Sequence, residues 1–490
     1  MVVWIDSVCI NQAIVQERNH QVSLMGRIYS EATGVIVWLG EEDEETARVA
    51  HLLAKIQTWA GTRSHTPGDS SGMLPELPWR LDPCWTYLSH FLERSWFTRA
   101  WVLQEVMLAK QCEMRCGSYR WPGGVLHSVS ASLGNGGPPD VTGVRQQLNA
   151  GVVGFSQAYS SHGSLLDLLE QARDTYSSDP RDKVYALLSL AHNCTLRADY
   201  SRKIEDVYCD VAIACLRDGN LDILRSAGDS VWNNIRHLPS WVPDWSSNER
   251  PVSLRQHRSG KLSGLHDTRF IRLSNDRRVL VVQARRIGSV RATGVPWSGN
   301  IRHQNIKGFP DYGLWEAGQF AYSRLESWRS MLWRWRDKSR RYIHTNESLT
   351  SAFARTVAAD VDTEIFLDGD AEETYTLYRA RLWELTRKSI EGFYSDRLQQ
   401  ADVLKEYHEA VRQACSKRTF FVTGNGYIGL GPFFTLPRDN LILVAGVTVP
   451  LIMRRTLTGK YRVVGECYVH GLMAGDWRWS RFPSEQISIV

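Results

Sequence analysis

The chain has 490 residues, too many for one ordinary hydrophobic core, so about two to four folded units are expected. Hydrophobic residues make up 43% and charged residues 23%, as in a globular protein that can bury a core. The 58 basic residues nearly balance the 53 acidic ones, and the net charge of +5 argues against nucleic acid as a partner. The longest apolar stretch, residues 441–453, is too short to span a membrane. The first residues lack the pattern of a signal peptide, so we expect a cytoplasmic protein.

The nine cysteines are an odd number, and they are widely spaced. Cys9 stands in an apolar run between Val8 and Ile10, which predicts a packed, reduced thiol. Cys112 and Cys116 have no second Cys or His pair at zinc-ligand spacing. We therefore expect no metal site.

The N-terminal third has the alternation of an α/β fold. Residues 2–10 are short, mostly apolar and rich in β-branched side chains, which predicts a buried strand. Apolar residues then recur at helical spacing over 16–32, and residues 35–39 predict a second buried strand. Strand, helix and strand with short connections predict a parallel sheet. The acidic run 41–45 is interpreted as the first turn of a helix and not as a cation site.

Further helices are predicted over 84–93, 98–110 and 201–219, and strand pairs over 270–273 with 279–283 and over 449–455 with 461–465. We expect three regions: a first domain over 1–118, a helical and mixed α/β region over 119–300, and an α+β region over 301–490 that is β-rich from about 416. A flexible connection is expected at 134–143.

Two motifs of the C-terminal region have a structural interpretation. Residues 424–429 match the G-x-G-x-x-G pattern of dinucleotide sites, but Gly431-Pro432 cannot continue a helix, so we predict a glycine-rich β turn. The aromatic and basic stretch 328–341 has helical spacing and predicts a docked helix with a solvated basic face.

Three ordered blocks resemble the signature of the fungal heterokaryon incompatibility (HET) domain. They are Trp4-Ile-Asp-Ser-Val-Cys-Ile-Asn-Gln12, Val35-Ile-Val-Trp-Leu-Gly40 and Trp101-Val-Leu-Gln-Glu105. Asp179-Pro-Arg-Asp-Lys-Val-Tyr-Ala-Leu-Leu188 and Trp241-Val-Pro-Asp-Trp245 resemble elements of full-length family members. The resemblance implies a role in fungal non-self recognition and regulated cell death. HET domains begin with a further upstream strand, so the domain is expected to lack its first strand, which would expose a sheet edge.

HET domains are remotely similar to TIR domains, which implies a TIR-like or flavodoxin-like sheet. In NAD-cleaving TIR members a Trp-x-x-x-Glu helix carries the reacting glutamate, and Trp101 and Glu105 have that spacing. Glu105 is therefore the candidate catalytic residue, beside Trp101 on one helix face. The alternative is that Glu105 is a structural carboxylate bonded to a loop or to a distant arginine.

Ligands of open α/β sheets bind beyond the carboxyl ends of the strands. By that rule Asn11, Gln12, Trp38 and Gly40 are candidates for the rim of a pocket. Asp6 is a further candidate, with a buried acid that caps a loop as the alternative.

The favoured function is a signalling protein of non-self recognition and cell death, acting through its HET domain with a protein partner or by self-association. One alternative is an NAD glycohydrolase, for which NAD would be a substrate and not a cofactor. The other is a catalytically inert interaction module. No cofactor is expected under any of the three.

Overall fold

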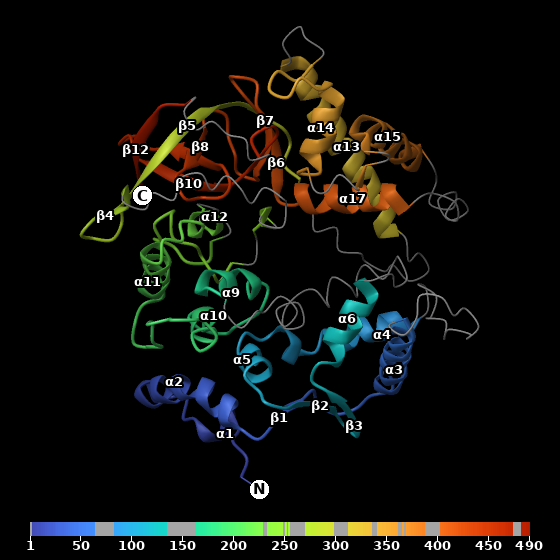
Figure 1. The fold of residues 1–490 in the computed structure, drawn as a ribbon, viewed down its shortest axis with the longest axis vertical. Helices are drawn as coiled ribbons and strands as arrows, with labels where there is room; N and C mark the ends of the chain where they lie inside the picture. Colours follow the sequence, from blue (N-terminus) through green and yellow to red (C-terminus); the bar gives the residue numbers. More distant parts are fainter. Residues whose placement is uncertain are drawn as a thin grey trace. The chain divides into compact units, whose positions relative to one another are not determined.

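The computed structural model describes residues 2–63, 83–134, 163–228, 233–247, 250–251, 253–254, 270–297, 312–335, 341–360, 365–366, 369–387, 402–473 and 482–490 (Figure 1). The chain divides into two compact units, Met1–Val211 (unit 1) and Ala212–Val490 (unit 2). The three regions expected from the sequence remain a prediction. The units are taken in turn.

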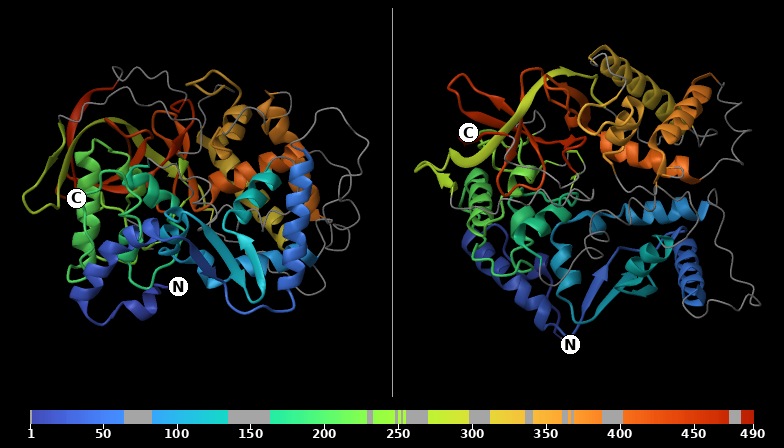
Figure 2. Two further views of the ribbon diagram at one scale, coloured as in Figure 1. Left: turned by 60° about the horizontal axis from the view of Figure 1, so that its bottom comes forward. Right: turned by 45° about the horizontal axis from the view of Figure 1, so that its top comes forward.

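Unit 1 contains a three-stranded sheet in the order β1-β2-β3 (Figure 2, left). β1 (Val35–Trp38) pairs in parallel with β2 (Cys112–Cys116), and β3 (Tyr119–Pro122) returns antiparallel to β2. The predicted strand at 35–39 is confirmed, but it is only half-buried, because Ile36 and Trp38 are 53% and 51% exposed. β1 has no strand on its other edge within the described residues.

The first helices of unit 1 form where the periodicity predicted them. α2 (Val15–Glu31) and α3 (Thr46–Arg63) bury apolar stripes, and α4 (Pro83–Leu92) packs beside α3. The acidic run 41–45 does not form the first turn of α3, which begins at Thr46 and has no acidic residue in that turn. It precedes the helix, and Asp43 Oδ1 accepts hydrogen bonds from Thr46 N (2.9 Å) and Glu45 N (3.1 Å). Unit 1 continues with η1 (Ser95–Thr98), α5 (Val102–Met107), α6 (Val125–Gly134), α9 (Leu165–Gln171), α10 (Asp182–Tyr185) and α11 (Ile204–Arg217), which extends into unit 2.

The strand predicted over residues 2–10 is wrong. Asp6–Cys9 form the short helix α1, flanked by extended residues, and Val2, Val3 and Val8 are more than half exposed. A strand needs a neighbour for its backbone groups, and no described strand lies beside this segment. The local preference of Asp6 for a turn therefore prevails, since its Oδ1 accepts from Ser7 N at 2.6 Å. Cys9 is exposed, which overturns its prediction as a packed thiol.

Unit 2 is built on a nine-stranded sheet, part of which closes on itself. β4 (Arg272–Leu273) forms a hairpin with β5 (Leu280–Thr293), and β5 pairs with both β12 (Ser484–Ile489) and β8 (Asn440–Val444). β9 (Leu451–Arg455) and β10 (Tyr461–Glu466) complete a ring in the order β5-β12-β10-β9-β8. Closure leaves these strands without a free edge along their paired length.

The far half of β5 leaves the ring and pairs with a second set of strands. Bulges between Arg286 and Gly288 and between Val290 and Ala292 bend it onto β6 (Arg418–Thr423), which is followed by β7 (Ile428–Pro432) and β11 (Tyr468–Val469). The strand pairs predicted near 272–283 and 451–465 and the β-rich segment from about 416 are confirmed. Residues 424–426 form the turn between β6 and β7, as predicted.

A helical group packs against β6 and β7 (Figures 1 and 2). It consists of α13 (Tyr312–Trp335), α14 (Leu349–Val357), α15 (Ala371–Arg387) and α17 (Asp402–Cys415), while α12 (Ile223–Ser226) lies against β10. Trp328 of α13 is fully buried, and its indole N–H donates to Val295 O at 2.7 Å. The predicted docked helix is confirmed through Trp328 and Leu332, whereas Trp335 is 43% exposed.

All nine cysteines are free thiols, and four of them, Cys116, Cys215, Cys415 and Cys467, are buried. In the described part of the chain, no helix is long and apolar enough to cross a membrane. Within the same ranges, no three His, Cys, Asp or Glu side chains are grouped so that they could hold a metal ion.

Candidate functional site

Glu105 lies on α5 and is partly buried. Its Oε2 accepts a hydrogen bond from the indole N–H of Trp96 at 3.1 Å. Asp6 and Arg99 are close enough to influence the charge of Glu105, and Asp6 forms a long ion pair with Arg99 (4.0 Å). Tyr29, buried on α2, is influenced by all three groups. Four separate stretches of unit 1 therefore converge on this carboxyl.

Burial raises the pKa of Glu105, and this effect outweighs the indole hydrogen bond and the positive charge of Arg99, which lower it. Burial also raises the pKa of Tyr29, and the charges of Glu105 and Asp6 add to that shift. The thiol of Cys112 has a pKa raised to about 11 by burial and by the charge of Glu105. Glu105 is thus a desolvated carboxyl with one guanidinium beside it, a group that can hold a proton or a charge away from water.

Trp101 is the N-cap residue of α5, and its indole lies close enough to the carboxylate of Asp182 in α10 to lower the pKa of that group, whereas the indole that donates to Glu105 is that of Trp96. The backbone of Trp101 is helical, with φ −63° and ψ −31°, so its spacing from Glu105 is that of a helix, and its part in the Glu105 site remains a prediction. Trp101 is therefore a residue that joins two parts of unit 1.

Asp182 is the centre of a buried polar network. It is 4% exposed, accepts a hydrogen bond from the hydroxyl of Tyr200, and lies 3.5 Å from Arg18 Nη2. The guanidinium of Arg18 stacks on the ring of Tyr200 with its carbon 3.5 Å from the ring centre. Burial raises the pKa of Asp182, while Tyr200, Trp101 and Arg18 lower it.

A second set of contacts ties the same two parts together through the backbone. Gln104 Nε2 donates to Ala186 O at 3.0 Å, and Ala100 N donates to Tyr176 O at 2.9 Å. The buried ammonium of Lys183 donates to the carbonyl oxygens of Arg173 and Thr175. The segment 173–200 is therefore built into the same core as the Glu105 cluster.

The predicted rim residues lie elsewhere in unit 1. Trp38 pairs with Arg115 at the carboxyl end of β1, whereas Cys112, which is influenced by Glu105, pairs with Val35 at the other end. The length of β1 is about 10 Å at the usual rise per residue. Gly40 has a φ of +102°, and its carbonyl oxygen accepts from Gly117 N at 3.0 Å, so it makes a turn after the strand.

Asn11 and Gln12 are exposed in the connection between α1 and α2. Asn11 closes a local turn there, with its side chain accepting from Ala13 N and its own N–H bonded to Glu17. The structure therefore brings Asp6 and Glu105 together and leaves Asn11, Gln12, Trp38 and Gly40 outside that cluster. Their role as a pocket rim remains a prediction.

Sequence reasoning did not select Tyr29, Trp96 or Arg99 as site residues. The helical spacing predicted Tyr29 as part of an apolar stripe. That prediction is confirmed, since Tyr29 is buried and packs edge-on against Trp4. Trp96 and Arg99 lie a few residues before Glu105, farther along the chain than one helical turn, so helical spacing from Glu105 does not indicate them. The signal that does indicate them is the presence of a cation and an indole donor in the stretch from η1 to α5.

The fold and this site define a two-unit α/β protein with a small open sheet in one unit and a closed ring of strands in the other. Residues 1–105 match the family model of the heterokaryon incompatibility protein (HET), and residues 340–480 match that of the Het-6 beta-barrel domain. The chain is also similar to the heterokaryon incompatibility protein 6, OR allele, of Neurospora crassa. The two are 25% identical over 559 aligned positions that cover 96% of this chain and 81% of the relative. No solved structure matches this chain.

These matches support a protein of the HET family, as the sequence motifs indicated. The first match ends at Glu105 in the middle of α5, whereas unit 1 continues to Val211. The HET match therefore covers about half of the compact unit in which it is folded.

Proposed function

We propose that this protein acts in the cytoplasm in fungal non-self recognition, with unit 1 as the effector that triggers regulated death of incompatible fused cells. The observation that carries the proposal is the similarity to a heterokaryon incompatibility protein along 96% of the chain, with both family matches present. Similarity restricted to the HET match would support only a shared domain.

The contacts inside unit 1 indicate which residues would belong to such an effector. The HET match and the segment after it share the buried Asp182 network and the Gln104–Ala186 hydrogen bond. These packed, hydrogen-bonded groups are the ones that would couple the two parts if the effector responds to a signal. In this proposal residues 163–211 belong to the effector.

The test is inducible expression of the full chain in a filamentous fungus, with cell death scored by uptake of a vital dye. The wild-type chain is expected to kill. Asp182→Asn removes the charge that Arg18 faces and should reduce killing at least about tenfold at equal protein level. The control is Asp174→Asn, at an exposed site, which should not reduce killing. No death with the wild-type chain, under expression that supports death by a known incompatibility protein, contradicts the proposal.

A second candidate function is cleavage of the nicotinamide glycosidic bond of NAD by a TIR-like mechanism. The observation that favours it is the desolvated Glu105 carboxyl, which has Arg99, Asp6 and Tyr29 around it. Bond cleavage passes through an oxocarbenium-like state, and a fixed carboxylate in a dry site stabilises such a state. Arg99 would favour the ionised form that this role needs.

This candidate is tested by incubating purified full chain with NAD and following nicotinamide release. Glu105→Gln should reduce turnover at least about 100-fold without unfolding the unit, and Glu113→Gln, on the neighbouring strand β2, is the control that should retain activity. NAD that stays intact for hours with concentrated wild-type protein rules out this candidate. Cell death without NAD cleavage would leave the signalling proposal standing, and the absence of both would favour the inert interaction module.

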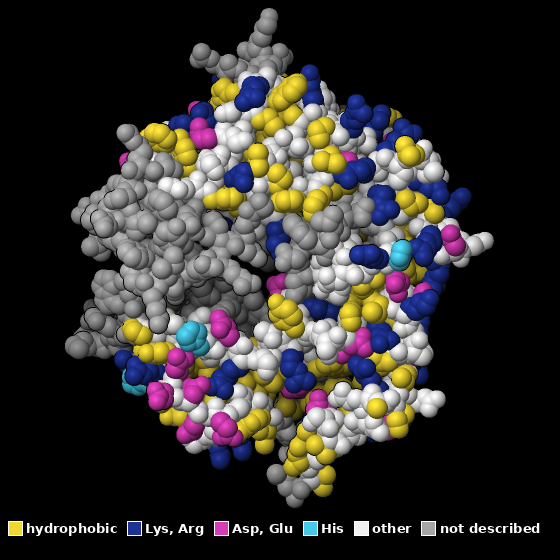
Figure 3. Space-filling model, turned by 180° about the vertical axis from the view of Figure 1, so that it is seen from behind, with side chains coloured by type: hydrophobic (Ala, Val, Ile, Leu, Met, Phe, Trp, Pro, Cys, Tyr) yellow, Lys and Arg dark blue, Asp and Glu magenta, His cyan; other side chains and the backbone are white. Residues whose placement is uncertain are grey.

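We propose self-association as the mode of partner binding. Apolar side chains gather on the N-terminal tip of unit 1, at the bottom of Figure 3, and the exposed ones include Val2, Val3, Ile5 and Val8. The adjacent strand β1 has one edge that no described strand pairs with, and it exposes Ile36 and Trp38. An exposed apolar surface beside an unpaired strand edge is the feature that supports contact with a second chain.

A further inference from the structure

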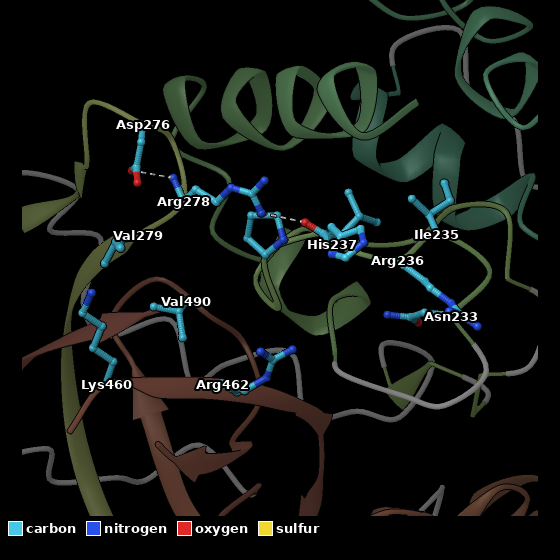
Figure 4. Close-up of a pocket in the computed structure, with 12 residues that line it drawn as sticks. Asn233, Ile235, Arg236, His237, Asp276, Arg278, Val279, Lys460, Arg462 and Val490 are labelled. Atoms are coloured by element: carbon cyan, nitrogen blue, oxygen red, sulfur yellow. Dashed lines mark hydrogen bonds between the residues drawn. The ribbon is translucent and has the colours of Figure 1, made fainter. Parts of the chain in front are cut away.

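Unit 2 contains a hollow of about 900 Å³ at one end of the strand ring (Figure 4). Four stretches line it: residues of the loop Asn233–Pro239, the β4–β5 turn with Asp276, Arg278 and Val279, the start of β10 with Lys460 and Arg462, and Val490 after β12. The strand register explains why they meet. Tyr461, Ile489 and Leu280 are partners across β10, β12 and β5, so the residues next to them lie at the same end of the ring.

Hydrogen bonds hold the loop against the strands and so fix the shape of the hollow. Ser240 N donates to Val490 O at 3.0 Å, and Ser240 Oγ accepts from Val463 N at 3.0 Å. The indole of the fully buried Trp241 donates to Arg278 O at 3.2 Å, and Arg278 Nη1 donates to His237 O at 2.8 Å. The site is therefore pre-formed from backbone and buried side chains.

The lining is strongly basic. It contains four permanent cations, Arg236, Arg278, Lys460 and Arg462, and one carboxylate side chain, Asp276. Asp276 is occupied within its own turn, where it accepts from Ser274 Oγ and Arg278 N, and these hydrogen bonds lower its pKa. Among the described residues no carboxylate lies within ion-pair distance of Arg236 or Lys460, so these two cations are not paired with an acid of the hollow.

Figure 4 shows how these cations are directed. Arg462 points from its strand toward the loop that carries His237, and Arg278 crosses from the hairpin toward the same loop. The apolar residues Ile235, Leu238, Pro239 and Val279 supply the rest of the wall. Guanidinium groups bind phosphate oxygens in pairs, and a hollow of this volume is in the range that encloses a small organic ligand.

We propose that this hollow is a binding site for a small phosphorylated molecule that carries at least two negative charges and an organic body. The cations surround a cavity from three chain stretches and do not follow an extended face, which favours a compact ligand over a nucleic acid. The apolar wall favours a ligand with an organic part over a bare anion. This site is separate from the Glu105 cluster of unit 1 and does not depend on the function proposed for it.

The test is titration calorimetry of the full chain at about 150 mM salt with ADP, adenosine and inorganic pyrophosphate as probes. We expect ADP to bind with a dissociation constant on the order of 100 μM, pyrophosphate to bind more weakly, and adenosine not to bind measurably. Lys460→Gln and Arg236→Gln should each weaken ADP binding about tenfold, since each removes a charge-assisted contact. Arg455→Gln is the matched control, because Arg455 is an exposed cation on the neighbouring strand β9 and does not line the hollow.

Thermal midpoints of the wild-type chain and the three variants are measured alongside. Arg236 is exposed and Lys460 is partly exposed, so the variants should have the same midpoint as the wild-type chain. The proposal is overturned if ADP and pyrophosphate both fail to bind at about 10 mM. It is also overturned if Arg455→Gln weakens binding as much as Lys460→Gln does, because the attraction would then be general. Binding to single-stranded oligonucleotides or to anionic vesicles without any binding of ADP would likewise assign the surface to another ligand and reject the proposal.

Discussion

The sheets of the two units differ in whether their edge strands have a hydrogen-bonding partner. In unit 2 the long strand β5 closes a ring, and every residue of β6, β7 and β8 is buried. In the described residues of unit 1 the sheet has three strands, and β1 has one edge without a partner strand there and two large apolar side chains that are half-exposed. The comparison teaches that unit 2 holds its own core, whereas the surface of unit 1 near β1 is available for a further contact.

The sharpest way to examine this difference is to remove one tryptophan from each unit. Trp328→Ala should cost about 3–5 kcal/mol, because the indole is fully buried, stacks on Phe420 and donates to Val295 O. Trp38→Ala, at a residue 51% exposed on β1, should cost less than about 1 kcal/mol. Calorimetric unfolding of the full chain measures both, and equal losses would mean that the β1 surface is covered in solution.

The second comparison concerns ion pairs. Glu466 is buried between Arg418 (2.9 Å) and Arg225 (3.4 Å), so Glu466→Gln leaves two buried cations facing a neutral amide and should cost about 3 kcal/mol. The unit 1 pair Arg27–Glu31 is exposed on both sides, and Arg27→Gln should change stability by less than about 0.5 kcal/mol. Denaturant titration decides this, and a small loss for Glu466→Gln would show that the arginines find other acceptors.

The two units should respond to pH with opposite signs. Burial alone would raise the pKa of Glu347 in unit 2, but hydrogen bonds from His470, Ser351 and Thr345 outweigh it and lower the pKa to about 2. Its contribution is therefore present above the unfolded value of 4.5 and is lost as pH falls from about 5 toward 2. In unit 1 the raised pKa of Glu105 means that its contribution is greatest at low pH and is lost as pH rises through the folded value.

Thermal midpoints measured between pH 3 and pH 8 test these signs. Glu347→Gln should reduce the loss of unit 2 stability at acid pH by roughly 1 kcal/mol, after allowance for the partial exposure of Glu347 to solvent. Glu105→Gln should reduce the loss of unit 1 stability as the pH rises. A Glu105→Gln protein whose unit 1 midpoint still falls from pH 5 to pH 8 as in the wild type would show that Glu105 is not desolvated.

The smallest effect on stability, and the most direct test of the free edge, comes from a charge on β1. Ile36→Lys should alter stability by less than about 0.5 kcal/mol, since Ile36 is 53% exposed. The added charge should nevertheless weaken self-association, because lysine on an edge strand opposes pairing. Light scattering over a concentration series measures the change, with Leu457→Lys on the β9–β10 turn as the control. Unaltered association would remove β1 from the proposed contact.

Local patterns predicted a large part of this protein. The stripes of α2, α3 and α11, the hairpin of β9 and β10, and the turn at residues 424–426 follow from the spacing of apolar residues and from glycine, which act over one or two turns of chain. The HET motifs gave the family for the same reason, because they are contiguous blocks. Of the candidate site, these patterns selected Asp6 and Glu105.

Tertiary contacts decided the rest. Residues 2–10 have the composition of a strand, yet they form the exposed helix α1, since a strand requires a partner that composition does not specify. Trp101 has the spacing to face Glu105, yet its indole lowers the pKa of Asp182, which is 81 residues farther along the chain. The closure of β5 onto β8 and β12, and with it the basic hollow of unit 2, depends on pairings across more than 150 residues. Such contacts are set by the packing of the whole core, and no local periodicity encodes them.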